Sequence, residues 1–319
     1  MKKIAVIDIG TNSIKLLVAE VSEITGIKKI IHRQKITRLG ENFNADKILK
    51  SEPIERTISA LEDFKTLAIS LGAVKIISIA TAALRSAKNP EIFLEKSDKI
   101  SMKPIVLSSK EEGILGRIGA SLEFKPENKP LVTLDIGGGS TELSFSEEDA
   151  VSLPIGAVVL TEKFIRTDPP AKKEIRSMEK FIGKNLKTLD PFKNFFPPEV
   201  KPMLVGVGGT ILTISAINLK LESYISEKIH RSVILYEKLD EILSKLSCLK
   251  LEERKKVAGL GFRFIADIVG GGKILKKTMD YLNVKKCHVS EFSLLQGILA
   301  VTELKNVSTC TPALKEKLT

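Results

Sequence analysis

Hydrophobic and polar positions predict alternating strands and helices. Residues 3–9 form a nearly continuous apolar run, typical of a buried central strand. Strands are expected over 14–21 and 27–36, completing a three-strand meander, and another over 75–80. A helix is predicted from Ser51, because its apolar residues recur every three or four positions.

The second half begins with the same pattern. A polar, proline-bearing stretch over 125–130 marks a boundary, which predicts domains at 1–125 and 126–319. The last helix, expected over 292–306, is free to pack back on the first domain, and the polar tail is expected to fray. A long helix over 262–282 and a last strand over 287–290 are also predicted. The fold class is therefore α/β with two domains.

The stretch at 133–143 reads as a strand, a glycine turn and a second strand. A glycine turn lets backbone N–H groups converge on an anion. Two acids flank the turn, where they could hold Mg²⁺ beside phosphate. A purely structural hairpin remains open for this motif alone. The candidate residues are Asp135, Gly137, Gly138, Gly139, Ser140, Thr141 and Glu142.

The motif occurs a second time near the N-terminus. Aligning Asp8 with Asp135 brings glycine onto glycine and serine onto serine. Two such turns facing each other would grip a phosphate chain and its metal. The repeat indicates two related domains. Its residues are Asp8, Gly10, Thr11, Asn12 and Ser13.

Two further stretches follow predicted strands. Arg85 lies just beyond the strand at 75–80, where its planar guanidinium could bind two phosphate oxygens or simply face solvent. Glu111 and Glu112 open a helix after Ser108 and Ser109, which fits a capping box. One glutamate suffices for the cap, so the other is available to orient and deprotonate water.

Composition limits the class of protein. A formal net charge of +11 favours a polyanionic partner without choosing among polyanions. The absence of Trp argues against a base-stacking surface for single strands. Three widely spaced cysteines indicate neither a zinc site nor a disulfide framework. The first apolar run is too short for a signal peptide, and no run is long enough to span a membrane.

Other polar and glycine-rich positions are left undecided. The glycines of 206–210 could bind an anion at a helix start or permit close packing. The three histidines, His32, His230 and His288, are assigned no role.

Five motifs in one order resemble the exopolyphosphatase / guanosine pentaphosphate phosphohydrolase (Ppx/GppA) family. They cover about the whole chain and comprise residues 8–13, 81–89, 111–113, 135–142 and 152–156. The resemblance implies a duplicated ribonuclease-H-like fold, as in actin, sugar kinases and heat-shock ATPases, with an active site in an interdomain cleft. The chain looks like a short, two-domain member.

The resemblance also implies roles for residues. It places the catalytic glutamate on Glu112, a divalent metal (Mg²⁺ or Mn²⁺) on Asp135 and Glu142 with Asp8 nearby, and phosphate binding on Arg85 and both glycine turns. The expected partners are polyphosphate or guanosine penta- or tetraphosphate, in the cytoplasm, without membrane or specific nucleic acid. The resemblance leaves room for a homodimer.

One stretch departs from the family pattern. Where members carry a Ser-Asp-x-Gly-Leu-Arg-Glu-Gly-like sequence, this chain has Glu291, Leu295 and Gln296 at the acid, arginine and glutamate positions. The change bears on substrate choice or domain docking. It keeps open a sensor that binds guanosine phosphates without cleaving them. A nucleotide-dependent kinase of the same fold is a separate alternative, and it would need an adenosine pocket in the second domain, around 206–210 and 270–272.

Overall fold

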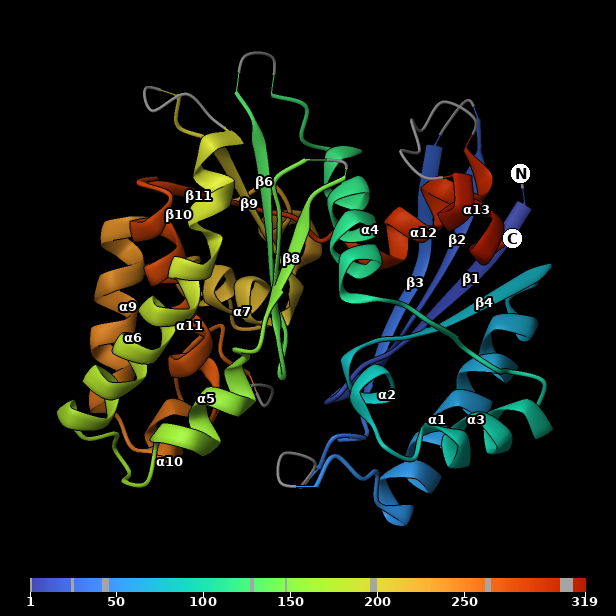
Figure 1. Cartoon of the computed structure of the whole chain (residues 1–319), viewed down its shortest axis with the longest axis horizontal. Helices are drawn as coiled ribbons and strands as arrows, with labels where there is room; N and C mark the ends of the chain where they lie inside the picture. Colours follow the sequence, from blue (N-terminus) through green and yellow to red (C-terminus); the bar gives the residue numbers. More distant parts are fainter. Residues whose placement is uncertain are drawn as a thin grey trace. The chain divides into compact units, whose positions relative to one another are not determined.

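The computed structural model describes residues 2–23, 26–41, 46–126, 129–146, 148–195, 200–261, 265–304 and 312–319. The chain divides into two compact units (Figure 1). The first contains Met1–Gly119 and Leu294–Thr319, and the second contains Ala120–Ser293. The division lies inside helix α4, before the predicted linker, and the last helices belong to the first unit.

The first unit is built on a five-stranded mixed sheet with the order β3-β2-β1-β4-β5. Strands β1, β2 and β3 form an antiparallel meander, and β4 and β5 continue the sheet in parallel with β1. The strands are β1 (Lys2–Ile9), β2 (Ser13–Ser22), β3 (Gly26–Ile36), β4 (Lys75–Ala80) and β5 (Ile105–Val106). The helices are α1 (Ser51–Ser70), α2 (Ala82–Ser86), α3 (Pro90–Lys99), α4 (Ser109–Ser121), α12 (Leu294–Glu303) and α13 (Pro312–Leu318).

Helices cover both faces of this sheet, which explains the apolar run of β1. Alternate side chains of a strand point to opposite faces. Ala5, Ile7 and Ile9 pack with Ile54 and Leu61 of α1 in one core. The intervening β1 side chains are also buried, and α12 contacts β1, β2 and β3. Figure 1 shows α1 and α3 on one side of the strands and α12 and α13 on the other.

The second unit repeats this plan. Its six-stranded sheet has the order β10-β11-β9-β6-β7-β8, so β8-β7-β6-β9-β11 corresponds to the whole first sheet. The strands are β6 (Leu131–Ile136), β7 (Thr141–Ser144), β8 (Ala150–Leu153), β9 (Met203–Val207), β10 (Val233–Leu235) and β11 (Lys286–Val289). The α-helices are α5 (Ala157–Phe164), α6 (Lys172–Leu186), α7 (Gly208–Asn218), α8 (Ser226–Ile229), α9 (Tyr236–Cys248), α10 (Leu251–Arg254) and α11 (Ile268–Tyr281), and η1 (Lys187–Phe195) is a 3₁₀ helix. The shared strand order confirms the duplicated ribonuclease-H-like fold.

Two sequence-based expectations near the C-terminus are wrong. The helix predicted over 262–282 begins only at Ile268; residues 262–264 lie outside the described part. The tail does not fray over 312–319, where it forms α13 with Leu314 and Leu318 buried. Leucines four positions apart share one face of a helix, and this face is covered.

Candidate active site

The two glycine turns are closed by the same backbone hydrogen bond. The Gly10 N–H donates to the Ser13 carbonyl at 3.0 Å, and the Gly137 N–H donates to the Ser140 carbonyl at 3.0 Å. The flanking strands pair in equivalent register, with Ile9 opposite Ile14 and Ile136 opposite Thr141. The alignment made on sequence therefore holds residue by residue.

The carbonyl groups of each turn are bound by the segment that follows the third strand of the meander. In the first unit, the Thr11 and Asn12 carbonyls accept N–H groups from residues 37, 38 and 40 at 2.9–3.2 Å. In the second unit, the Gly137 and Gly138 carbonyls accept N–H groups from residues 157–159 at 2.9–3.2 Å.

With the carbonyls occupied, the opposite polar side of each turn is left for a ligand. Across the described ranges, the N–H groups of Thr11, Asn12, Gly138 and Gly139 donate to no protein acceptor. Convergent, unpaired N–H groups of this kind bind anions.

Each supporting segment approaches its turn through a glycine. A Cβ on Gly156 would lie 2.2 Å from the Gly138 carbonyl oxygen, and one on Gly40 would lie 2.3 Å from Thr11 Cγ2. The sequence analysis missed the role of Gly40. The signal was present, because Leu39-Gly40 follows β3 as Ile155-Gly156 follows β8, and the repeat extends that far.

The charge opposite the turn aspartate differs between the units. Asp8 pairs across the strands with Lys15, whose Nζ lies 3.3 Å from Asp8 Oδ2. At the equivalent position Asp135 lies opposite Glu142, whose Oε1 accepts the Ser152 hydroxyl at 2.7 Å. Like charges directly opposite each other repel, so a cation bound there would relieve a repulsion that the Asp8–Lys15 pair does not have.

The carboxylates fit the implied Mg²⁺ or Mn²⁺ in part. Asp8 is 4% exposed, and its Oδ1 has no hydrogen-bond donor in the described part of the chain, as an unused metal ligand would. Among the described residues no group of three or more His, Cys, Asp or Glu side chains is placed to hold a metal ion. Mg²⁺ commonly takes only one or two carboxylates and completes its shell with water and substrate phosphate. The carboxylates present would be sufficient for Mg²⁺ bound in this way.

Glu112 lies in the first turn of α4 and forms an ion pair. Arg85 Nη1 donates to Glu112 Oε2 at 2.8 Å and to the Leu107 carbonyl at 3.0 Å. Both side chains are mostly buried, at 19% and 16% exposed. Arg85 is therefore not a simple surface arginine, and it orients the Glu112 carboxylate. Both bonds use Nη1, which leaves Nε and Nη2 without a protein acceptor in the described residues.

Glu111 supplies the predicted cap. Its carboxylate accepts the Ser108 N–H at 2.6 Å, and its own N–H donates to Ser108 Oγ at 3.2 Å. This reciprocal pair is a capping box. The cap thus uses Glu111 and leaves Glu112 to Arg85, a division that the residue pattern alone did not specify.

Thr141, which the sequence predicts to contact phosphate, and the glycines of 206–210, whose role the sequence leaves open, have partners within the protein. The Thr141 side chain is fully buried and donates its hydroxyl to the Ile155 carbonyl, so it supports the turn and cannot reach a ligand. At 206–210, Gly206 packs on Cys287, while a Cβ on Gly208 would lie 2.2 Å from Asp135 Oδ1. The start of α7 is thus occupied by the protein's own carboxylate.

The kinase alternative would place an adenosine pocket around the glycines at 270–272, and these glycines pack closely against neighbouring helices. All three are buried in α11. A Cβ on Gly271 would lie 2.5 Å from Thr210 Cγ2, and one on Gly272 would lie 2.3 Å from Leu243 Cδ2. These glycines permit close packing of α11 against α7 and α9.

The altered stretch at 290–297 is divided between the units. Glu291 accepts the hydroxyls of Tyr224 and Ser226 in the second unit. Leu295 and Gln296 are buried in α12 of the first unit. A Cβ on Gly297 would lie 1.9 Å from the Leu115 carbonyl oxygen of α4, which shows how closely α12 approaches α4. At the position where the family has arginine, this chain therefore has a buried leucine, Leu295, that packs inside the first unit.

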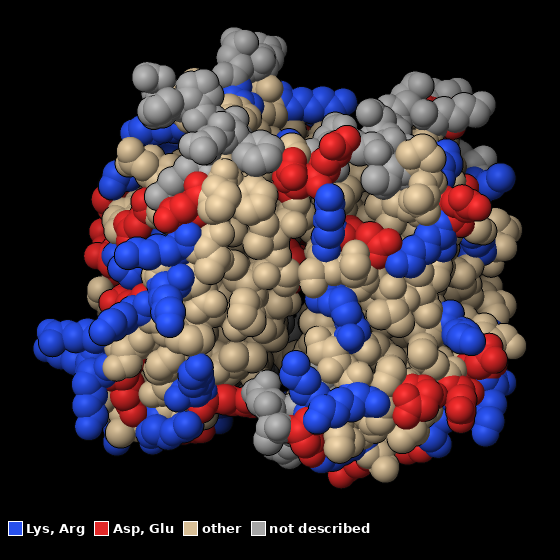
Figure 2. All heavy atoms as spheres, viewed as in Figure 1, with Lys and Arg blue, Asp and Glu red and all other residues tan. Residues whose placement is uncertain are grey.

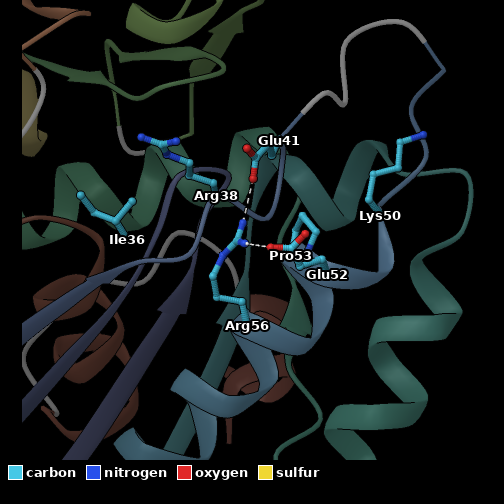
Figure 3. Close-up of a pocket in the computed structure, with 7 residues that line it drawn as sticks. All are labelled: Ile36, Arg38, Glu41, Lys50, Glu52, Pro53 and Arg56. Carbon is cyan, nitrogen blue, oxygen red and sulfur yellow. Dashed lines mark hydrogen bonds and ion pairs between the residues drawn. The ribbon is translucent and has the colours of Figure 1, made fainter.

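A pocket of about 540 Å³ in the first unit is lined by the end of β3, the segment after it and the start of α1 (Figure 3). Arg56 fastens the segment that supports the turn: its Nε donates to the Thr37 carbonyl at 2.7 Å and its Nη2 lies 2.8 Å from Glu41 Oε2. Arg38, whose N–H binds the Asn12 carbonyl, extends its guanidinium away from this ion pair in Figure 3. The sequence analysis identified neither arginine.

The chain matches known proteins over nearly its whole length. Residues 17–306 match the model of the Ppx/GppA phosphatase family. The chain is 30% identical to "Exopolyphosphatase 2" of Mycobacterium tuberculosis, covering 93% of this chain and 98% of that protein. It is 34% identical to "Bifunctional 3-dehydroquinate synthase/phosphatase" of Fusobacterium nucleatum, covering 92% of this chain but spanning only 46% of that protein.

A solved structure of similar fold supports the match. The Aquifex aeolicus member of the Ppx/GppA family superposes with a TM-score of 0.80 at 30% identity, covering 93% of this chain and 96% of that one. In the described part of the chain, no helix is both long and apolar enough to cross a membrane.

Proposed function

The chain belongs to the Ppx/GppA phosphatase family, and on that basis we propose that it hydrolyses the terminal phosphoanhydride bond of inorganic polyphosphate, of guanosine pentaphosphate, or of both. The observation that carries the proposal is the pair of equivalent turns whose N–H groups have no protein acceptor. Each turn by itself can bind a phosphate group through these N–H groups, and a linear chain of phosphates offers many such groups.

Glu112 is the proposed general base. Its carboxylate would accept a proton from water as the water oxygen attacks the terminal phosphorus. The bond from that phosphorus to the bridging oxygen breaks, which releases phosphate and a chain shorter by one unit. Arg85 holds Glu112 by Nη1, and its remaining donors would bind phosphoryl oxygens as negative charge spreads over them.

Within the second unit, Asp135 and Glu142 would hold the divalent cation. Such a cation, when bound, neutralises charge on the phosphate oxygens. The backbone N–H groups of the turns would also stabilise negative charge on phosphate oxygens, because their dipoles are fixed in place. No cysteine or histidine is assigned to a covalent intermediate, so direct attack by water is the simpler route.

Replacing Glu112 by Gln tests the proposal. We expect phosphate release to fall about 10²- to 10⁴-fold with little change in KM, because the amide keeps the shape but cannot accept the proton. The assay measures phosphate release from long-chain polyphosphate and from guanosine pentaphosphate, side by side, with Mg²⁺. The ratio of the wild-type rates identifies the preferred substrate.

Glu62→Gln is the matched control, since Glu62 is exposed on α1 of the same unit and carries the same change of charge. Near-wild-type turnover in Glu112→Gln would sink the assignment. Tight binding of guanosine pentaphosphate by the wild type without any phosphate release would instead support the sensor alternative.

A further inference from the structure

The C-terminal helix α13 lies beyond the part of the chain that matches the family. The match ends at residue 306, whereas α13 spans Pro312–Leu318. The helix nevertheless belongs to the first unit and contacts α12. Leu314 and Leu318 are 5% and 2% exposed. Because both leucines are buried, α13 is packed against the first unit rather than loosely attached.

Docking brings Lys317 to the start of α4. Its Nζ lies 2.9 Å from Glu111 Oε1 and 2.8 Å from Glu111 Oε2. The same carboxylate closes the capping box with Ser108. Burial acts to raise the pKa of Glu111, but the hydrogen bonds from Lys317 and Ser108 outweigh it and hold that pKa below its usual value. Glu111 thus stays ionised and can serve both partners at once.

The first turn of α4 also carries Glu112. The Glu112 N–H donates to the Ser108 carbonyl at 3.0 Å, in the turn that the capping box closes. Its carboxylate is bound by Arg85, which also binds Leu107, the residue before the cap. Any tilt of this turn would move the Glu112 carboxylate relative to Arg85.

We propose that Lys317 is a positioning residue, which acts through Glu111 to hold the first turn of α4 and thereby the carboxylate of Glu112. The kinetic part rests on the proposed function, in which Glu112 is the general base. The contact is partly exposed, with Lys317 at 39% and Glu111 at 24%, so it adds little to global stability. Its effect is on the position of the Glu112 carboxylate, because a small displacement of a catalytic group lowers the reaction rate much more than it lowers stability.

The test compares Lys317→Met, Lys317→Arg and Lys315→Met. Lys315 is exposed on the same helix, and its side chain forms no ion pair with a described residue. In Lys317→Met we expect kcat for phosphate release to fall about 3- to 10-fold with KM unchanged, because the cap on Glu111 loosens while the phosphate contacts remain. Lys317→Arg should restore most of kcat, and Lys315→Met should match the wild type.

A second measurement does not depend on turnover. Amide hydrogen exchange at Glu111, Glu112 and Gly113 should become faster in Lys317→Met and stay unchanged in Lys315→Met. Unchanged exchange at these amides, or an equal fall of kcat in both methionine variants, would overturn the proposal. A wild-type protein that releases no phosphate from either substrate would refute the proposed function alone, and the exchange rates would still decide whether Lys317 holds α4.

Discussion

At the scale of single residues, the two turns show how one neighbour changes the chemistry of an aspartate. Asp8 has the ammonium of Lys15 opposite it, and Asp135 has the carboxylate of Glu142. A built-in cation partly neutralises the first site. The second site has two acidic side chains opposite each other, so we propose that it contributes the larger share of metal binding. The same backbone hydrogen bond closes both turns, so the difference in charge between the two sites comes from their side chains.

Gly208 offers a test of the second site. Its φ is +85°, and a Cβ there would lie 2.2 Å from Asp135 Oδ1. In Gly208→Ala we expect Asp135 to be displaced and Mg²⁺-dependent phosphate release to fall at least about tenfold, a loss of about 1.4 kcal/mol. Release is measured over a Mg²⁺ titration, with thermal unfolding beside it.

Gly261→Ala separates the two effects of that substitution. Gly261 also has a positive φ, of +60°, but a Cβ there would meet no atom within 4 Å. Both variants carry backbone strain of roughly 1 kcal/mol, since a left-handed residue with a Cβ is strained. Only Gly208→Ala should lose activity. Equal losses in the two variants would show that strain, not Asp135, was responsible.

At the scale of elements, each turn depends on a segment that arrives from the far edge of the meander. The segment after β3 supports the first turn, and the start of α5 supports the second. These hydrogen bonds occupy turn carbonyls, which leaves the N–H groups for a ligand. Arg56 ties the segment after β3 to α1 through the Thr37 carbonyl and Glu41. Its role is to hold the support of the turn in place.

Arg56→Met should therefore weaken substrate binding more than the chemical step. Without the bond to Thr37, the segment that binds the Thr11 and Asn12 carbonyls loosens, and KM for polyphosphate should rise about 3- to 10-fold with a smaller change in kcat. Initial rates over a range of polyphosphate concentrations measure both constants. Arg33→Met, an exposed change on β3 of the same unit, is the control, and an identical rise there would contradict the assignment.

At the scale of the whole molecule, the chain carries a formal net charge of +11. On the face shown in Figure 2, Lys and Arg side chains are interspersed with Asp and Glu. A diffuse positive charge attracts polyanions at long range but does not hold them in one register. Recognition of a phosphate chain is therefore expected to come from the turns and Arg85, with the general charge raising the rate of encounter.

Global stability should fall as the pH is lowered from neutral. Burial, with the nearby charges of Lys286 and Lys129, holds the pKa of His288 below its usual 6.5. The unfolded chain then binds more protons than the folded one below about pH 6.5, so acid favours unfolding. Glu111 adds a second loss below its usual pKa of 4.5, because its folded pKa is also lowered and its stabilising bonds disappear on protonation.

Urea unfolding at pH 7.5 and 5.5 checks the first of these losses. Wild type should unfold at lower urea at pH 5.5, and His288→Gln should show a smaller difference between the two pH values. His32→Gln, on the exposed side of β3, should behave as the wild type. A pH-independent midpoint in the wild type would contradict the assignment to His288.

The sequence by itself determined the features whose partners are close along the chain. The two turns, their strand register and the presence of a capping box at the start of α4 all join residues within a few positions, so spacing and residue type suffice to predict them. The sequence leaves open which glutamate forms the cap. The repeat then predicted the duplicated fold, since equivalent strands follow equivalent turns.

Only the tertiary structure decided which distant groups meet. Arg85 pairs with Glu112, which lies 27 positions away in the chain, and Lys317 pairs with Glu111, which lies 206 positions away. Gly208 meets Asp135 because β9 lies beside β6. Such pairs depend on how sheets and helices pack, and the sequence around a polar residue does not identify its partner. The side chains that orient the candidate catalytic groups therefore become visible only when the packing is known.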